Sequence, residues 1–114
     1  MIAAICAVPL LCEALTAALE GIAEVESFPA GGGDPDGLLR WLRPDGLVVD
    51  TPEAAAAIEG YARATGCPLV HVQLAKQQLR VLKDGNWKKV KDASAESIRN
   101  VLVGCIYAPG PVSA

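Results

Sequence analysis

The chain has 114 residues, of which 52% are hydrophobic, and its formal net charge is −3 at pH 7. This length favours one domain with a single core, and the apolar content excludes a largely disordered chain. The negative charge excludes a global field that would attract nucleic acid, so nucleic acid is not an expected partner. We expect one domain over residues 1–108 and a loose tail over residues 109–114.

The first part of the chain alternates strand and helix patterns. Residues 2–8 are apolar throughout, which is typical of a strand that helices cover on both faces. Pro9 opens a helix that runs to about Glu20, and residues 23–28 alternate as an edge strand does. The apolar start lacks a basic leader and is interrupted by Glu13. We therefore expect no signal peptide, no membrane partner and a cytoplasmic protein.

Four cysteines, none in a CxxC pair, fit the same compartment. We expect reduced thiols rather than a disulfide framework. They are Cys6, Cys12, Cys67 and Cys105.

A loop rich in glycine, proline and aspartate follows over residues 29–37 and includes Gly31 to Gly33. Such a run can cradle phosphate, but here no GK[ST] or GxGxxG motif accompanies it, and its aspartates would repel phosphate. We interpret it as a flexible surface loop. A short helix over residues 37–42 should come next, with Trp41 half-covered and Pro44 ending it.

The stretch over residues 43–53 organises the rest of the chain. Its β-branched run, residues 47–49, predicts a buried central strand. Thr51 can cap a helix that begins at Pro52. Asp50 should then lie at the carboxyl end of a central strand, where open α/β sheets place their sites.

The second half predicts a change of topology. A helix over residues 52–65 and a strand over residues 68–74 continue the alternation, so the strands up to this point should be parallel. Only about four residues then precede the next strand pattern, which is too few for a parallel crossover. With Asp84-Gly85 as a turn signal, residues 79–90 predict an antiparallel hairpin, and residues 94–107 predict a last helix. The expected fold is a three-layer α/β sandwich with a mostly parallel sheet and an antiparallel C-terminal hairpin.

Two stretches resemble the receiver domain of bacterial two-component response regulators. They are Pro9-Leu10-Leu11-Cys12-Glu13-Ala14-Leu15, after an apolar strand, and Leu42-Arg43-Pro44-Asp45-Gly46-Leu47-Val48-Val49-Asp50. The resemblance covers residues 1 to about 72. It implies a flavodoxin-like, receiver-like fold, a role in signal transduction, and Asp50 as the candidate phosphoacceptor.

The same resemblance implies a damaged site. Receivers hold Mg²⁺ with an acidic pair after the first strand, and the matching positions here are Cys6 and Ala7. The fourth strand ends without a hydroxyl residue, and Lys83 ends a strand in a hairpin that the family lacks. We therefore expect a pseudo-receiver with no catalytic residues, no metal site and no cofactor, which is not an enzyme. It would act by protein–protein contact or dimerisation. The alternative is a phosphoryl-accepting switch that uses Asp50.

Other features have plainer interpretations beside the functional ones. Asp50 can be a solvated or helix-capping carboxylate. His71 can be a satisfied core histidine rather than a metal ligand or half of a Cys/His pair. A third class of function is a small-molecule binder near Gly31 to Gly33.

The hairpin carries the candidate partner surface. It consists of Trp87, expected to be exposed, with Lys83, Lys88 and Lys89 around it. Aromatic and basic residues together also occur in nucleic-acid interfaces. The plainer interpretation is that the lysines protect an edge strand from aggregation.

Overall fold

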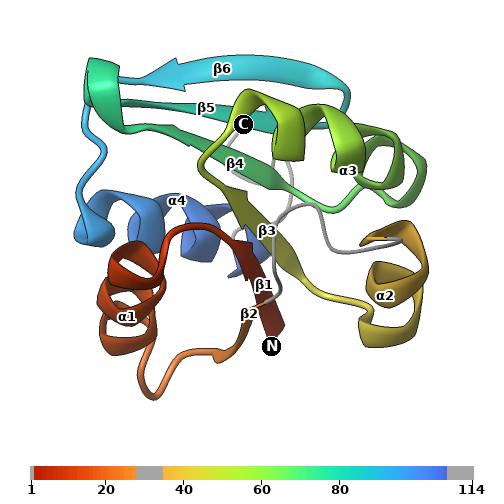
Figure 1. Cartoon of the computed structure of the whole chain (residues 1–114), viewed down its shortest axis with the longest axis horizontal. Helices are drawn as coiled ribbons and strands as arrows, with labels where there is room; N and C mark the ends of the chain where they lie inside the picture. The colour runs from red at the N-terminus through yellow and green to blue at the C-terminus, as the bar shows by residue number, and fades with distance from the viewer. Residues whose placement is uncertain (1, 28–34, 108–114) are drawn as a thin grey trace.

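One six-stranded mixed sheet organises the fold (Figure 1). The computed structural model describes residues 2–27 and 35–107, and within these ranges the sheet is accompanied by four helices. The strands are β1 (Ile2–Cys6), β2 (Glu24–Ser27), β3 (Gly46–Val49), β4 (Leu69–Gln73), β5 (Gln78–Lys83) and β6 (Asn86–Val90). The helices are α1 (Pro9–Ala18), α2 (Pro35–Leu42), α3 (Pro52–Thr65) and α4 (Ala95–Tyr107), and a short 3-10 helix, η1, covers Leu74–Lys76.

The sheet order is β2-β1-β3-β4-β5-β6. The first four strands pair in parallel, whereas β5 and β6 pair antiparallel, as the sequence predicted. The reversal after β4 takes only η1 and Gln77, whose φ of 51° lies in the left-handed region. So short a link cannot carry the chain back to start another parallel strand.

Helices lie on both faces of the sheet, and a separate core fills each side (Figure 1). We call these the α1/α4 face and the α2/α3 face. The core of the α1/α4 face includes Ile5, Leu15, Val48, Val70, Leu79 and Ile98. The core of the α2/α3 face includes Cys6, Leu39, Val49, Ile58, Leu69 and Leu82.

Local signals begin and end the elements around the centre of the sheet. The Thr51 hydroxyl accepts a hydrogen bond from the Ala54 N–H at 3.1 Å, which caps α3 as expected. Gly66 ends α3 at a φ of 74°. Asp84 and Gly85 have φ values of 54° and 79°, which is the pair of left-handed residues that a tight hairpin turn needs.

Several predicted boundaries were wrong by a few residues. β1 ends at Cys6 rather than residue 8, because Val8 is already outside the sheet and 47% exposed. α2 begins at Pro35, so the predicted loop over residues 29–37 is partly helical. Trp41 was expected to be half-covered and is 79% exposed. Gly31 to Gly33 and the predicted tail over residues 109–114 lie outside the described residues.

No helix in the described ranges combines the length and the apolar character that crossing a membrane requires.

Candidate functional site

Asp50 follows the last residue of β3 and is half-buried at the carboxyl end of the parallel strands. Its Oδ2 accepts a hydrogen bond from the backbone N–H of Val8 at 3.0 Å. Val8 comes two residues after β1, so the carboxylate joins the ends of two neighbouring strands. Asp50 therefore has a structural partner at the position that the sequence singled out.

The neighbouring end of β1 offers a thiol and a methyl group instead of carboxylates. Cys6 is the last residue of β1, is paired with Val49 of β3, and is followed by Ala7. Burial raises the pKa of the Cys6 thiol, and the nearby Asp50 charge raises it further. A protonated thiol is a poor ligand for Mg²⁺, which prefers oxygen.

Cys6, Val49 and His71 lie side by side on three neighbouring strands of the sheet. Val49 pairs with His71, and His71 pairs with Arg80 of β5. The imidazole is 4% exposed, and its Nδ1 has no hydrogen-bond partner. The expectation of a satisfied core histidine was therefore wrong at this nitrogen. Burial lowers the pKa of His71, and Arg80 lowers it further, against an opposing effect of Asp50.

These residues do not assemble a metal site or a nucleophilic pair. Cys6 lies on β1 and His71 on β4, and β3 runs between these strands. At the usual strand spacing, the two Cα atoms are therefore about 10 Å apart. Within residues 2–27 and 35–107, no group of three His, Cys, Asp or Glu side chains could hold a metal ion. The end of β4 carries Gln73, whose side-chain oxygen accepts a hydrogen bond from Gln78, and no hydroxyl.

The hairpin residues are less uniform than the sequence indicated. The expectation that Trp87 is exposed was wrong, because the indole is half-buried against the α2/α3 core. The Arg80 guanidinium lies 4.5 Å from the centre of the ring, in cation–π geometry. Lys83 is also half-buried, and its Nζ donates a hydrogen bond to the Cys105 carbonyl of α4 at 3.1 Å. Of the predicted surface, only Lys88 and Lys89 are exposed.

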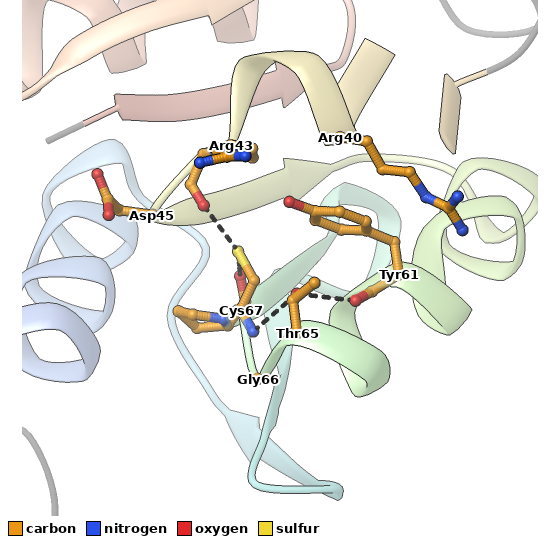
Figure 2. Close-up of a pocket in the computed structure, with 9 residues that line it drawn as sticks. Arg40, Arg43, Asp45, Tyr61, Thr65, Gly66 and Cys67 are labelled. Atoms are coloured by element: carbon orange, nitrogen blue, oxygen red, sulfur yellow. Dashed lines mark hydrogen bonds between the residues drawn. The ribbon is translucent and has the colours of Figure 1, made fainter. Parts of the chain in front are cut away.

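A cavity of 570 Å³ opens at the other end of the strands, near their amino termini (Figure 2). Sequence reasoning missed it, because it is formed by the ends of α2 and α3 and by two loops that meet only in the fold. Figure 2 shows Arg40 and Arg43 on one side, and Tyr61, Thr65 and Cys67 on the other.

The reactive groups of this cavity are bound to the backbone. The Tyr61 hydroxyl donates to the Leu39 carbonyl at 3.3 Å, and the Cys67 thiol donates to the Pro44 carbonyl at 3.4 Å. Burial raises the pKa of the Cys67 thiol to about 12, with a further contribution from Asp45. A thiol of that pKa is not a nucleophile at neutral pH.

Compared with protein-family models, with curated proteins and with solved structures, the chain matches none.

Proposed function

We propose that this chain is a receiver-like module that works by protein–protein contact and has no phosphoryl-transfer chemistry of its own. The carrying observation is the surroundings of Asp50. Its carboxylate accepts the Val8 N–H, and the adjacent strand end presents Cys6 and Ala7 where phosphoryl transfer would need a pair of metal-binding carboxylates.

The sheet order supports a receiver-like relationship for the first two-thirds of the chain. Four parallel strands in the order β2-β1-β3-β4 agree with the order expected of a flavodoxin-like sheet, and Asp50 follows the third of them, β3. The order then departs from that pattern, because β5 runs antiparallel to β4. An Asp50 without neighbouring carboxylates, together with a C-terminal half that differs from the receiver pattern, favours a module whose function is contact.

The hairpin is the contact surface in this proposal. β6 has one neighbour only, so one side of its backbone is unpaired within the described sheet. Lys88 and Lys89 extend from opposite faces of this strand and are exposed. Trp87 is half-buried and does not project from this surface, because Arg80 covers its ring.

Incubation with acetyl phosphate and Mg²⁺, followed by intact-mass measurement, tests the absence of chemistry. We expect no mass increase of one phosphoryl group, with Asp50→Asn as the matched control. An Mg²⁺ titration followed by NMR should show no saturable shift below about millimolar, the range of weak divalent sites. A phosphoryl adduct on Asp50 that Asp50→Asn abolishes would establish the alternative, the phosphoryl-accepting switch.

The contact surface needs a separate test. Lys88→Glu with Lys89→Glu changes the exposed charges and leaves Trp87 in place, so folding should be preserved by circular dichroism. We expect the pair to lose the proteins that the wild-type chain retains in a pull-down from native lysate. Equal retention by the wild type and the double variant would place the contact surface elsewhere, with α1 as the next candidate.

A further inference from the structure

The two edge strands of the sheet carry opposite charges. β2 exposes Glu24 and Glu26, and β6 exposes Lys88 and Lys89. In the described part of the chain, none of these four residues has an ion-pair partner. The molecule therefore presents an acidic edge and a basic edge at opposite ends of one sheet (Figure 1).

The strand register shows which face each charge belongs to on β2. Glu26 pairs with Ala4, which belongs to the α2/α3 core, so Glu24 and Glu26 lie on the α2/α3 face. Val25 lies on the opposite face, where it packs against the α1/α4 core.

On β6, the two exposed lysines lie on opposite faces of the sheet. Trp87 packs on the α2/α3 core, so Lys89, two residues later, lies on that face as well. Val90 packs on the α1/α4 core, so Lys88 lies on the α1/α4 face. One lysine therefore extends from each face of the basic edge.

A hollow of 680 Å³ completes the acidic edge on the α1/α4 face. Glu13 of α1 and Glu20 of the turn after α1 contribute carboxylates to the wall of this hollow. Small residues form much of the rest of the wall. Val25 of β2 also lines it. Each face of the acidic edge thus offers carboxylates, two from β2 on one side and two beside α1 on the other.

The strand directions allow the two edges to meet. β6 is antiparallel to β5, and β5 is antiparallel to β4, so β6 runs in the same direction as β2. A second copy displaced along the sheet can set its β2 beside β6 as a parallel neighbour, with corresponding faces on the same side. Lys89 then meets Glu24 and Glu26, and Lys88 meets the acidic hollow.

Like edges do not fit one another. Two β6 edges would oppose lysine to lysine, and two β2 edges would oppose glutamate to glutamate, both of which are destabilising. Lysines on an edge strand commonly prevent such pairing. Here they exclude a symmetric contact and leave the acidic edge of another copy as the complementary surface.

We propose that copies of this chain associate head to tail, with β6 of one copy against β2 of the next. This rests on the proposed function in taking the hairpin as the contact surface, and it identifies the partner as the chain itself. Such a contact is heterologous, so it adds copies in series rather than closing a symmetric dimer. Six strands per copy predict a repeat of about 29 Å along the sheet.

A charge exchange tests the pairing. One variant carries Lys88→Glu and Lys89→Glu, so both of its edges are acidic. The other carries Glu24→Lys and Glu26→Lys on β2 with Glu13→Lys and Glu20→Lys at the hollow, so both of its edges are basic. In sedimentation velocity at low salt, we expect wild-type mass to rise with concentration from micromolar to millimolar. Each variant alone should associate more weakly, on the order of tenfold or more, because like charges then oppose each other.

The equimolar mixture of the two variants is the decisive sample. Every contact between unlike variants pairs an acidic edge with a basic one, so association should return in the mixture and weaken at high salt. Lys76→Glu, a charge reversal on exposed η1, is the matched control and should associate as the wild type does.

Three results would overturn this proposal. They are a wild-type chain that stays monomeric at millimolar concentration, variants that associate alone as the wild type does, and a mixture that remains monomeric. The first result removes self-association but leaves the hairpin free to contact a different protein, which the pull-down with the lysine variant decides. Wild-type association that the lysine variant does not weaken would instead remove the hairpin surface from both proposals.

Discussion

Asp45 makes two hydrogen bonds with Ile2. Its Oδ2 accepts the Ile2 N–H at 2.8 Å, and its own N–H donates to the Ile2 carbonyl at 2.7 Å. Asp50 makes the corresponding contact with Val8 beyond the other end of β1. The two aspartates that flank β3 therefore hold the two ends of the neighbouring strand.

This arrangement predicts a stability cost at Asp50 that depends on the acceptor oxygen. Asp50→Ala should lower the free energy of unfolding by about 1–2 kcal/mol, because the Val8 N–H loses its partner. Asp50→Asn keeps an acceptor oxygen and should cost less. Urea unfolding of the two variants measures the difference. Equal losses would show that charge rather than the hydrogen bond matters at this position.

The cap of α3 gives a second stability prediction. Thr51→Ala removes the acceptor for the Ala54 N–H and should cost about 1 kcal/mol in thermal or urea unfolding. Thr51→Ser keeps the hydroxyl and is the control. If the serine variant is as unstable as the alanine variant, the methyl group of Thr51, and not its hydroxyl, stabilises this end of the helix.

His71 predicts a dependence of stability on pH. Its folded pKa lies below the ordinary value of 6.5, so the unfolded chain binds a proton at a higher pH than the folded chain does. Stability from this residue is complete above pH 6.5 and falls as the pH drops below it. His71→Leu should remove that fall and, by replacing an unpartnered buried nitrogen, should leave the protein as stable or more stable at pH 7.

Unfolding curves between pH 7 and pH 5 provide the comparison. At pH 7 the free energy of unfolding of the wild type should equal that of His71→Leu or lie slightly below it. The difference between the two should grow as the pH falls to 5. Parallel curves for the two proteins would show that His71 titrates alike in the folded and unfolded chains.

Cys67 should resist alkylation in the folded protein. A thiol with a pKa of about 12 is almost wholly protonated at pH 8. By thiolate fraction alone, its reaction with iodoacetamide should be about a thousandfold slower than in the unfolded chain. Peptide mapping with and without urea measures the ratio. Rapid labelling of Cys67 in the absence of urea would contradict the hydrogen-bonded, protonated thiol.

The order of the elements could be predicted from local patterns in the sequence. The short link before β5 and the Asp84-Gly85 turn predicted the antiparallel hairpin, and Thr51 and Gly66 marked the ends of α3. These signals are local, because a turn or a cap depends on neighbouring residues. They therefore survive in the folded chain with shifts of only a few residues.

The surroundings of the side chains could not be predicted in the same way. The two tryptophans differ from their expected exposure in opposite directions, with Trp87 half-covered and Trp41 79% exposed. Trp87 is covered by Arg80, a residue from the neighbouring strand whose position depends on the register. The Asp50–Val8 contact also joins residues 42 positions apart, and no local pattern announces it.

The position of β4 between the two halves of the sheet has a consequence for synthesis. Leu47, Val48 and Val49 of β3 are fully buried in the finished fold, and β4 supplies their last strand neighbour. While residues beyond 68 are still within the ribosome, the nascent chain can form three parallel strands but exposes β3 as an apolar edge. Such an edge is where partly made chains aggregate, so this protein should need a chaperone most just before β4 emerges.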